Sequence, residues 1–306
     1  MTLASTPPDS KNGYRPAASG LGRLSNRRRA TNGLACALLA LSLILALLPL
    51  VAVLTYTVRR GAGAINFSFL THSMKGIGPL DANGGAYHAV IGTLQQVGIA
   101  AILTIPLGLA VAIYIVEVGH GRLAATVRFF VDVMTGIPSV VAGLFIFTFW
   151  VVGLNQGFSG LAAGLALSIL MLPIVVRSIE EMLRLVPDEL REASYALGIP
   201  KWRTVVSIVL PSAASGITTG VVLAIARVTG ETAPLLLTAF GYDAIRTSPL
   251  EGAQSSLPLY VFSQAGSSFD VAINRAWAAA LTLIVIVLLL TALARLLSRR
   301  NRLVGN

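Results

Sequence analysis

Long apolar stretches dominate the chain, and they recur at a length suited to crossing a lipid bilayer as helices. A helix rises about 1.5 Å per residue, so about 20 apolar residues span the roughly 30 Å of hydrocarbon. The pattern predicts an all-α membrane protein with about six transmembrane helices. The predicted spans are residues 33–58, 89–116, 136–153, 157–176, 215–239 and 277–297.

Composition agrees with this pattern. Of 306 residues, 55% are apolar and only 12% are charged, whereas about a quarter of a soluble domain is charged. The chain therefore lacks the material for a water-facing surface. The single cysteine, Cys36, excludes an intramolecular disulfide and the paired spacing of a zinc site.

The N-terminal residues differ from the rest. Residues 1–32 are rich in Ser, Pro, Gly, Asn and Arg and show no apolar period, which is typical of disorder. We predict a disordered basic cytoplasmic tail at 1–32, followed by a transmembrane domain at 33–300. That domain includes one long cytoplasmic loop at 177–214.

The positive charges predict the orientation. Of the 23 Lys and Arg residues, 17 fall in the two termini and in the loops at 117–135 and 177–214, and five fall in the opposite loops. Because cytoplasmic loops carry the excess of Lys and Arg, both termini are expected in the cytoplasm.

The loop at 177–214 is expected to be folded. Asp188 is placed to cap a short helix, Gly198 to end it in a left-handed turn, and Pro200 to prevent its continuation. Five acidic and five basic residues make the loop locally neutral. These features favour a protein partner over a polybasic contact with lipid.

The loop sequence EASYALGIPKWRTVVSIVLP resembles a motif of the permease subunits of ATP-binding cassette (ABC) importers. Ser194 stands where those permeases usually have alanine. The resemblance implies the type I importer permease fold and a short helix that docks on a cytoplasmic ATPase. The alternative is an ordinary amphipathic helix at the membrane surface. The matching positions, which we expect to couple the chain to the ATPase, are Glu192, Ala193, Gly198, Ile208, Leu210 and Pro211.

The sequence contains no GxxxxGK[ST] loop to cradle the phosphates of ATP. We therefore expect no enzyme activity and no cofactor in this chain, with ATP and Mg bound by a partner ATPase. The three histidines, His72, His88 and His120, are expected outside the spans as solvated or interfacial residues.

The predicted fifth span carries two charges, Arg227 and Glu231. A helix that starts at Ser215 would place Arg227 roughly 18 Å along its axis, near the middle of the bilayer. A lipid-facing charge there costs about 2.5 to 3.5 kcal/mol. Four residues apart, the two side chains would share a helix face and could pair, and both are expected to face inward.

Two interpretations of this pair compete. In the first, the pair is a structural clamp to a neighbouring helix. In the second, Gly230 and Pro234 break the helix and expose donors from Thr229 and Thr232 to a midplane path. There Arg227 would meet an anion, because a guanidinium is a permanent, planar donor suited to oxyanions.

The stretch VLAIARVTGETAPLL resembles the A-type permeases of phosphate importers, as do GIPSVVAGLF and SLPLYVF. The likeness runs from about residue 90 to 297 and implies that Arg227 and Glu231 act in phosphate passage. It also implies a heterodimer with a second homologous permease, two copies of a cytoplasmic ABC ATPase and an external phosphate-binding protein. The expected location is a bacterial cell membrane, and no nucleic-acid partner is expected.

Three alternatives stay open from the residues alone. The same type of permease could carry another oxyanion such as sulfate or molybdate. An ion-coupled secondary carrier could use Arg227 and Glu231 as a proton-coupled pair, and a structural or sensory subunit would use them only for folding. The outer loop at 240–276 could contact the binding protein or be a plain connector.

Overall fold

The computed structural model describes residues 26–81 and 83–302. Within these residues the regular secondary structure is helical, with loops between the helices and one isolated bridge between Phe240 and Gln254. Three short π-helical segments (η) interrupt the α-helices. The elements are α1 Asn26–Ala62, α2 Phe67–Thr71, α3 Tyr87–Ile113, η1 Tyr114–Val118, α4 Gly121–Thr135, α5 Ser139–Ile146, η2 Phe147–Gly153, α6 Gly160–Arg184, α7 Asp188–Ala196, α8 Lys201–Thr204, η3 Val205–Val209, α9 Leu210–Thr229, α10 Ala233–Thr238, α11 Leu257–Ala265 and α12 Asp270–Arg302.

The chain divides into two compact units at Thr55 and Tyr56. In the first unit, the described residues are most of α1, a helix whose side chains are exposed. Residues 26–32 belong to this helix, so that part of the predicted disordered tail was wrong. Arginine is a good helix former, and the helix runs on into the apolar stretch. Residues 1–25 of the predicted tail lie outside the described residues.

Five described helices are long and apolar enough to cross a membrane, and a bent pair raises the number to six if the pair counts as one span. The pair is α4 with α5 and η2, which meet at an angle of 103°. The five single spans are Asn26–Ala62, Tyr87–Val118, Gly160–Arg184, Lys201–Thr229 and Asp270–Leu293.

The bend corrects the predicted third span, 136–153. That stretch forms only the second arm of the pair, and α4, which we had assigned to a cytoplasmic loop, forms the first. Gly136 caps α4, and Pro138 precedes α5 with an extended backbone (ψ 138°). Proline has a fixed φ and disfavours helical geometry in the residue before it, so the two arms cannot join as one straight helix.

The predicted fifth span, 215–239, was also wrong as a continuous helix. The structure has one span from Lys201 through η3 to Thr229. It ends at Gly230, and α10 starts only at Ala233. Likewise α6 continues to Arg184, so the segment between spans is shorter than the predicted loop at 177–214.

Helix α6 forms the core of the second unit. Its buried residues recur every four positions, on the face of the helix that packs inward. Gly164 lets it approach α3 closely, because a Cβ there would lie 2.6 Å from a methyl carbon of Ile99. The buried side chains in this row are Leu167, Met171, Val175, Ile179 and Leu183.

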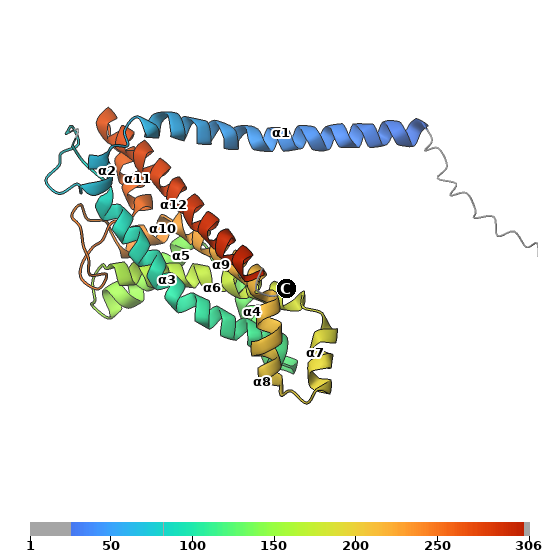
Figure 1. The fold of residues 1–306 in the computed structure, drawn as a ribbon. Helices are drawn as coiled ribbons and strands as arrows, with labels where there is room; N and C mark the ends of the chain where they lie inside the picture. The colour runs from blue at the N-terminus through green and yellow to red at the C-terminus, as the bar shows by residue number, and fades with distance from the viewer. Residues whose placement is uncertain (1–25, 82, 303–306) are drawn as a thin grey trace, which may run out of the picture. The chain divides into compact units, whose positions relative to one another are not determined.

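The outer loop is not a plain connector over its whole length, because amide side chains fasten part of it to α3. Gln96 donates to Gln254 Oε1 and to the Ser255 carbonyl at 3.2 Å each, and Gln254 donates to Gln95. Helix α11 follows directly. Figure 1 shows α2 and α11 at one end of the second unit and α7 and α8 at the other.

One histidine differs from its prediction. His88 lies inside α3 and is only 2% exposed, with its ring edge-on to Tyr260 at 5.4 Å. It is therefore a buried residue rather than a solvated or interfacial one. His72 and His120 lie outside the spans, as predicted.

Candidate functional site

A cavity of about 430 Å³ lies where two interruptions of the helical spans meet the proline inside α6. The interruptions are the bend between α4 and α5 and the break between α9 and α10. Backbone irregularity at membrane depth is tolerated where it lines a cavity or is buried in protein. The lining residues are Met134, Thr135, Ile137, Pro138, Ser139, Leu170, Pro173, Ile174, Arg227, Val228 and Glu231.

Both charged residues singled out from the sequence line this cavity. Arg227 lies in the last turn of α9 and is exposed, and Glu231 follows the break and is half-buried. Because α9 ends at Thr229, Glu231 is not on the helix of Arg227, and the expected pairing along one helix face does not form. Neither side chain has an ion-pair or hydrogen-bond partner among the described residues.

The depth expected for Arg227 rested on a helix that starts at Ser215. Ser215 instead lies inside α9, in a span that begins at Lys201, so that estimate does not hold. A positive side chain in the last turn of a helix is stabilised by the negative end of the helix dipole, which favours Arg227 where it is.

The two predicted hydroxyl donors are not at the cavity. Thr229 is 2% exposed, and its hydroxyl donates to the Ile225 carbonyl at 2.6 Å within α9. Thr232 precedes α10 and makes no side-chain capping bond, and neither residue lines the cavity. A hydroxyl that is bonded back to its own helix is not available to a solute.

Gly230 and Pro234 lie at the break, as expected from the sequence. Gly230 caps α9, and Pro234 stands in the first turn of α10, where its missing N–H costs nothing. Pro234 also packs against α5, since a Cβ on Gly143 would lie 2.6 Å from the Pro234 Cα. This close approach holds the break beside the cavity.

A second polar contribution comes from the start of α5. Pro138 and Ser139 both line the cavity, and Ser139 is the first residue of α5. The first N–H groups of a helix lack partners within it and favour negative charge. The cavity therefore combines a guanidinium and a helix N-terminus, which attract an oxyanion, with one carboxylate, which opposes its retention. Sequence reasoning missed Ser139, because the bend that exposes the start of α5 was not predicted.

The motif residues lie on and after α7. Glu192 and Ala193 are exposed on α7, and Gly198 has the left-handed conformation predicted for it, with φ 72°. Asp188 is the first residue of α7 rather than its cap, which is Pro187. An acidic residue in the first turn still interacts favourably with the helix dipole.

The remaining motif residues continue into the following span. Ile208 lies in η3, and Leu210 and Pro211 begin α9. Ser194, at the position where the resemblance has alanine, is 2% exposed, and its hydroxyl lies 2.8 Å from that of Thr204. This hydrogen bond closes the turn between α7 and α8.

Large apolar side chains around α7 are left uncovered. Leu185 is 73% exposed, Leu197 79% and Trp202 67%. Large exposed apolar side chains outside the membrane spans are candidates for contact with a partner. At the cytoplasmic end of the second unit, these residues fit a protein partner better than water.

Sequence reasoning also missed a group of ion pairs at the cytoplasmic end of α6. Glu180 is 2% exposed and contacts Arg128 at 3.0 Å, Arg177 at 3.2 Å and Arg184 at 2.8 Å. Arg177 also pairs with Asp132 of α4. The sequence shows these charges but gives no sign that three arginines converge on Glu180 and that one of them also pairs with Asp132.

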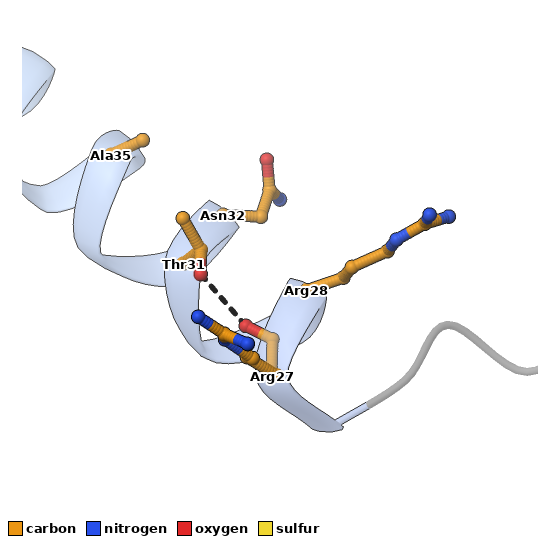
Figure 2. A pocket seen from close by; sticks show the side chains of 5 residues that line it. All are labelled: Arg27, Arg28, Thr31, Asn32 and Ala35. Carbon is orange, nitrogen blue, oxygen red and sulfur yellow. Dashed lines mark hydrogen bonds between the residues drawn. The ribbon is translucent and has the colours of Figure 1, made fainter.

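A hollow of about 560 Å³ lies beside the start of α1. Figure 2 shows its five residues, all from α1, with the Thr31 hydroxyl donating to the Arg27 carbonyl at 2.8 Å. Since one helix alone provides the walls, it supports no ligand site. The residues are Arg27, Arg28, Thr31, Asn32 and Ala35.

Comparison with solved structures defines the class of fold. A chain of the inward-facing MetNI methionine ABC transporter superimposes with a TM-score of 0.57 at 20% identity, covering 69% of this chain and 93% of that chain. A chain of a bacterial alginate ABC transporter gives 0.58 at 18% identity, covering 90% and 96%. The predicted fold, a type I ABC importer permease, is confirmed.

Sequence comparison identifies the family. The model of the binding-protein-dependent transport system inner membrane component matches residues 104–303. The phosphate transport system permease protein PstA 1 of Mycobacterium tuberculosis (strain ATCC 25618 / H37Rv) is 47% identical over 283 residues, covering 91% of this chain and 92% of the relative. PstA of Mycobacterium leprae (strain TN) is 48% identical over 265 residues, covering 86% and 87%.

The chain belongs to the family of binding-protein-dependent transport system inner membrane components. It is a multi-pass protein of the bacterial inner membrane and a permease subunit of an ABC transporter. Permeases of this family work with another permease, an ATPase and a substrate-binding protein.

Proposed function

We propose that the chain is a permease subunit that moves inorganic phosphate into the cytoplasm, driven by ATP hydrolysed on a partner subunit. The observation that carries the proposal is the cavity lined by Arg227 and Glu231, neither of which has an ion-pair or hydrogen-bond partner among the described residues. Relatives named as phosphate transport permeases, at 47% and 48% identity, support phosphate as the cargo.

The chemistry of the cavity suits an oxyanion that must be bound and then released. Arg227 supplies up to five donors in a planar fork, and the first turn of α5 supplies N–H groups. Glu231 lines the same cavity and repels an anion, so an oxyanion is bound there less tightly than by Arg227 alone. Such a balance favours turnover over retention.

The exposed position of Arg227 fits an assembly of two permeases. A charge facing lipid is costly, whereas a second homologous permease would supply the missing wall of the cavity. We therefore propose a heterodimer, two copies of a cytoplasmic ATPase that bind ATP and Mg, and an external phosphate-binding protein. Helix α7 and the exposed side chains beside it would contact the ATPase.

The test is uptake by the reconstituted complex. Proteoliposomes that contain both permeases, the ATPase and the binding protein should take up radiolabelled phosphate when ATP is supplied on the cytoplasmic side. Sulfate in tenfold excess should leave the rate unchanged. Preferential uptake of sulfate would contradict the cargo, and uptake without the ATPase would contradict the energy source.

A further inference from the structure

Arg191 makes five hydrogen bonds, more than any other side chain of α7. Nε and Nη2 both donate to Glu117 Oε1, at 3.2 and 2.8 Å. Nη1 donates to the Val186 carbonyl at 2.6 Å and to Asp188 at 3.1 Å, and Nη2 donates to the Leu183 carbonyl at 3.0 Å. One guanidinium therefore joins α7 to the end of η1 and to the C-terminal end of α6.

The contact with Glu117 is buried. The Arg191 side chain is 13% exposed and that of Glu117 is 4% exposed, whereas Asp188 is 86% exposed. The hydrogen bonds that Arg191 donates to the Glu117 carboxylate raise the pKa of Arg191 above its usual range. Separating this pair would leave the buried Glu117 carboxylate without its partner, so the pair holds its elements in one arrangement.

Helix α7 has a second connection at its other end. The hydrogen bond between Ser194 and Thr204 ties it to α8, the start of the span that ends beside Arg227. Arg191 ties it to α6, which lines the cavity through Leu170 and Pro173. Both connections lead from the ATPase-facing helix to a wall of the cavity.

We propose that the Arg191–Glu117 pair is a positioning pair that makes α7 move as one body with η1 and the C-terminal end of α6. ATPase closure then displaces the cavity wall at α6 instead of only tilting α7. The proposal rests on the proposed function, because it assigns the pair to transmission between the ATPase and the translocation cavity. Packed helices pass on such displacements because a dense interior deforms little.

The experiment measures phosphate transported per ATP hydrolysed by the full complex in proteoliposomes. Arg191→Met and Glu117→Gln should lower this ratio at least tenfold, while the amount of ATPase that co-purifies stays within twofold. Arg191→Lys keeps the charge but not the fork, so it should lower the ratio by an intermediate factor.

The matched control is Asp188→Asn. It removes the other acidic partner of the same guanidinium, but an exposed one, and it should leave the ratio within twofold. The proposal is overturned if Arg191→Met keeps the normal ratio or if Asp188→Asn lowers it equally. It is also overturned if both Arg191→Met and Arg191→Lys lose the ATPase on purification, since the pair would then serve attachment or folding.

The outcome can be separated from failure of the proposed function. If the wild-type complex moves no phosphate, the cargo is wrong. The role of the Arg191–Glu117 pair is then still testable, because ATP hydrolysis stimulated by the loaded binding protein should fall in Arg191→Met and not in Asp188→Asn.

Discussion

The cavity beside Arg227 and the cytoplasmic end of α6 both contain charged side chains, but they differ in how those charges are paired. Glu180 contacts three arginines, and Glu117 contacts Arg191. At the cavity, Arg227 and Glu231 have no partner among the described residues. Paired charges can hold helices together with no ligand present, whereas unpaired charges at a cavity leave their interactions for a solute.

The largest effect is expected at Arg227. Arg227→Ala should abolish phosphate uptake, because no other described side chain lining the cavity carries a positive charge. The complex should still assemble, since Arg227 forms no ion pair with another side chain in the part of the chain that the structure describes. Uptake by proteoliposomes and co-purification of the ATPase measure the two properties. Normal uptake by Arg227→Ala would show that Arg227 is not needed for the passage of phosphate.

At Glu180 we expect a loss of stability with little change in uptake, the reverse of the result expected at Arg227. Glu180→Gln removes the carboxylate shared by three arginines, and losing one partner of a buried ion pair costs about 3 to 5 kcal/mol. Thermal unfolding of the purified complex should shift clearly downward, whereas uptake per folded complex should stay within threefold. Arg184→Ala is the control: its side chain is 55% exposed, and exposed pairs contribute about 0 to 1 kcal/mol. Equal shifts in the unfolding temperature for both variants would contradict the claim that the buried Glu180 carboxylate stabilises the fold more than its exposed partner Arg184.

Glu231→Gln should have a moderate effect of a different kind. Removing the negative charge strengthens anion binding in the cavity, so phosphate should leave more slowly. We expect turnover to fall about tenfold, equivalent to about 1.4 kcal/mol in the barrier, with no loss of assembly. Saturation curves of uptake against loaded binding protein report this turnover. An unchanged maximal rate would remove Glu231 from the account of release.

The smallest effect is expected at Thr229, which the sequence placed on the path and the structure does not. Thr229→Val keeps the shape of the side chain and removes a hydroxyl that donates to the Ile225 carbonyl of its own helix. Uptake should stay within twofold of wild type. A fall of tenfold or more would return Thr229 to the route and contradict the position of the cavity.

Apolar stretches and a spaced motif were enough to predict the class of fold, the region of α7 and the two charges at the cavity. The prediction of spans failed where two arms of one bent pair differ in hydropathy. Helix α4 carries Arg122, Arg128 and Asp132 and is less apolar than α5, so the apolar pattern predicts a loop there. The break at Gly230 was predicted, but the pattern does not show that the Thr229 hydroxyl donates to the Ile225 carbonyl within α9.

Contacts between distant charges were equally invisible. Glu117 and Arg191 are 74 positions apart, and Arg128 and Glu180 are 52 apart. The sequence indicated that these residues lie near the cytoplasmic side but not that they meet. Such pairing depends on how η1 packs against α7 and α4 against α6, which no local pattern specifies.

The most direct test of the central claim is whether an anion reaches the cavity and competes there with phosphate. Ser139→Cys, in a Cys36→Ser background that contains no other cysteine, places a thiol on the cavity wall. Leu144→Cys, on the same helix, 51% exposed and outside the cavity, is the control. An anionic thiol reagent should modify the thiol at 139 in the assembled, reconstituted complex, and phosphate-loaded binding protein with ATP should slow this modification but not that at 144. No modification at 139, or a rate that phosphate does not change, would contradict the cavity as the route.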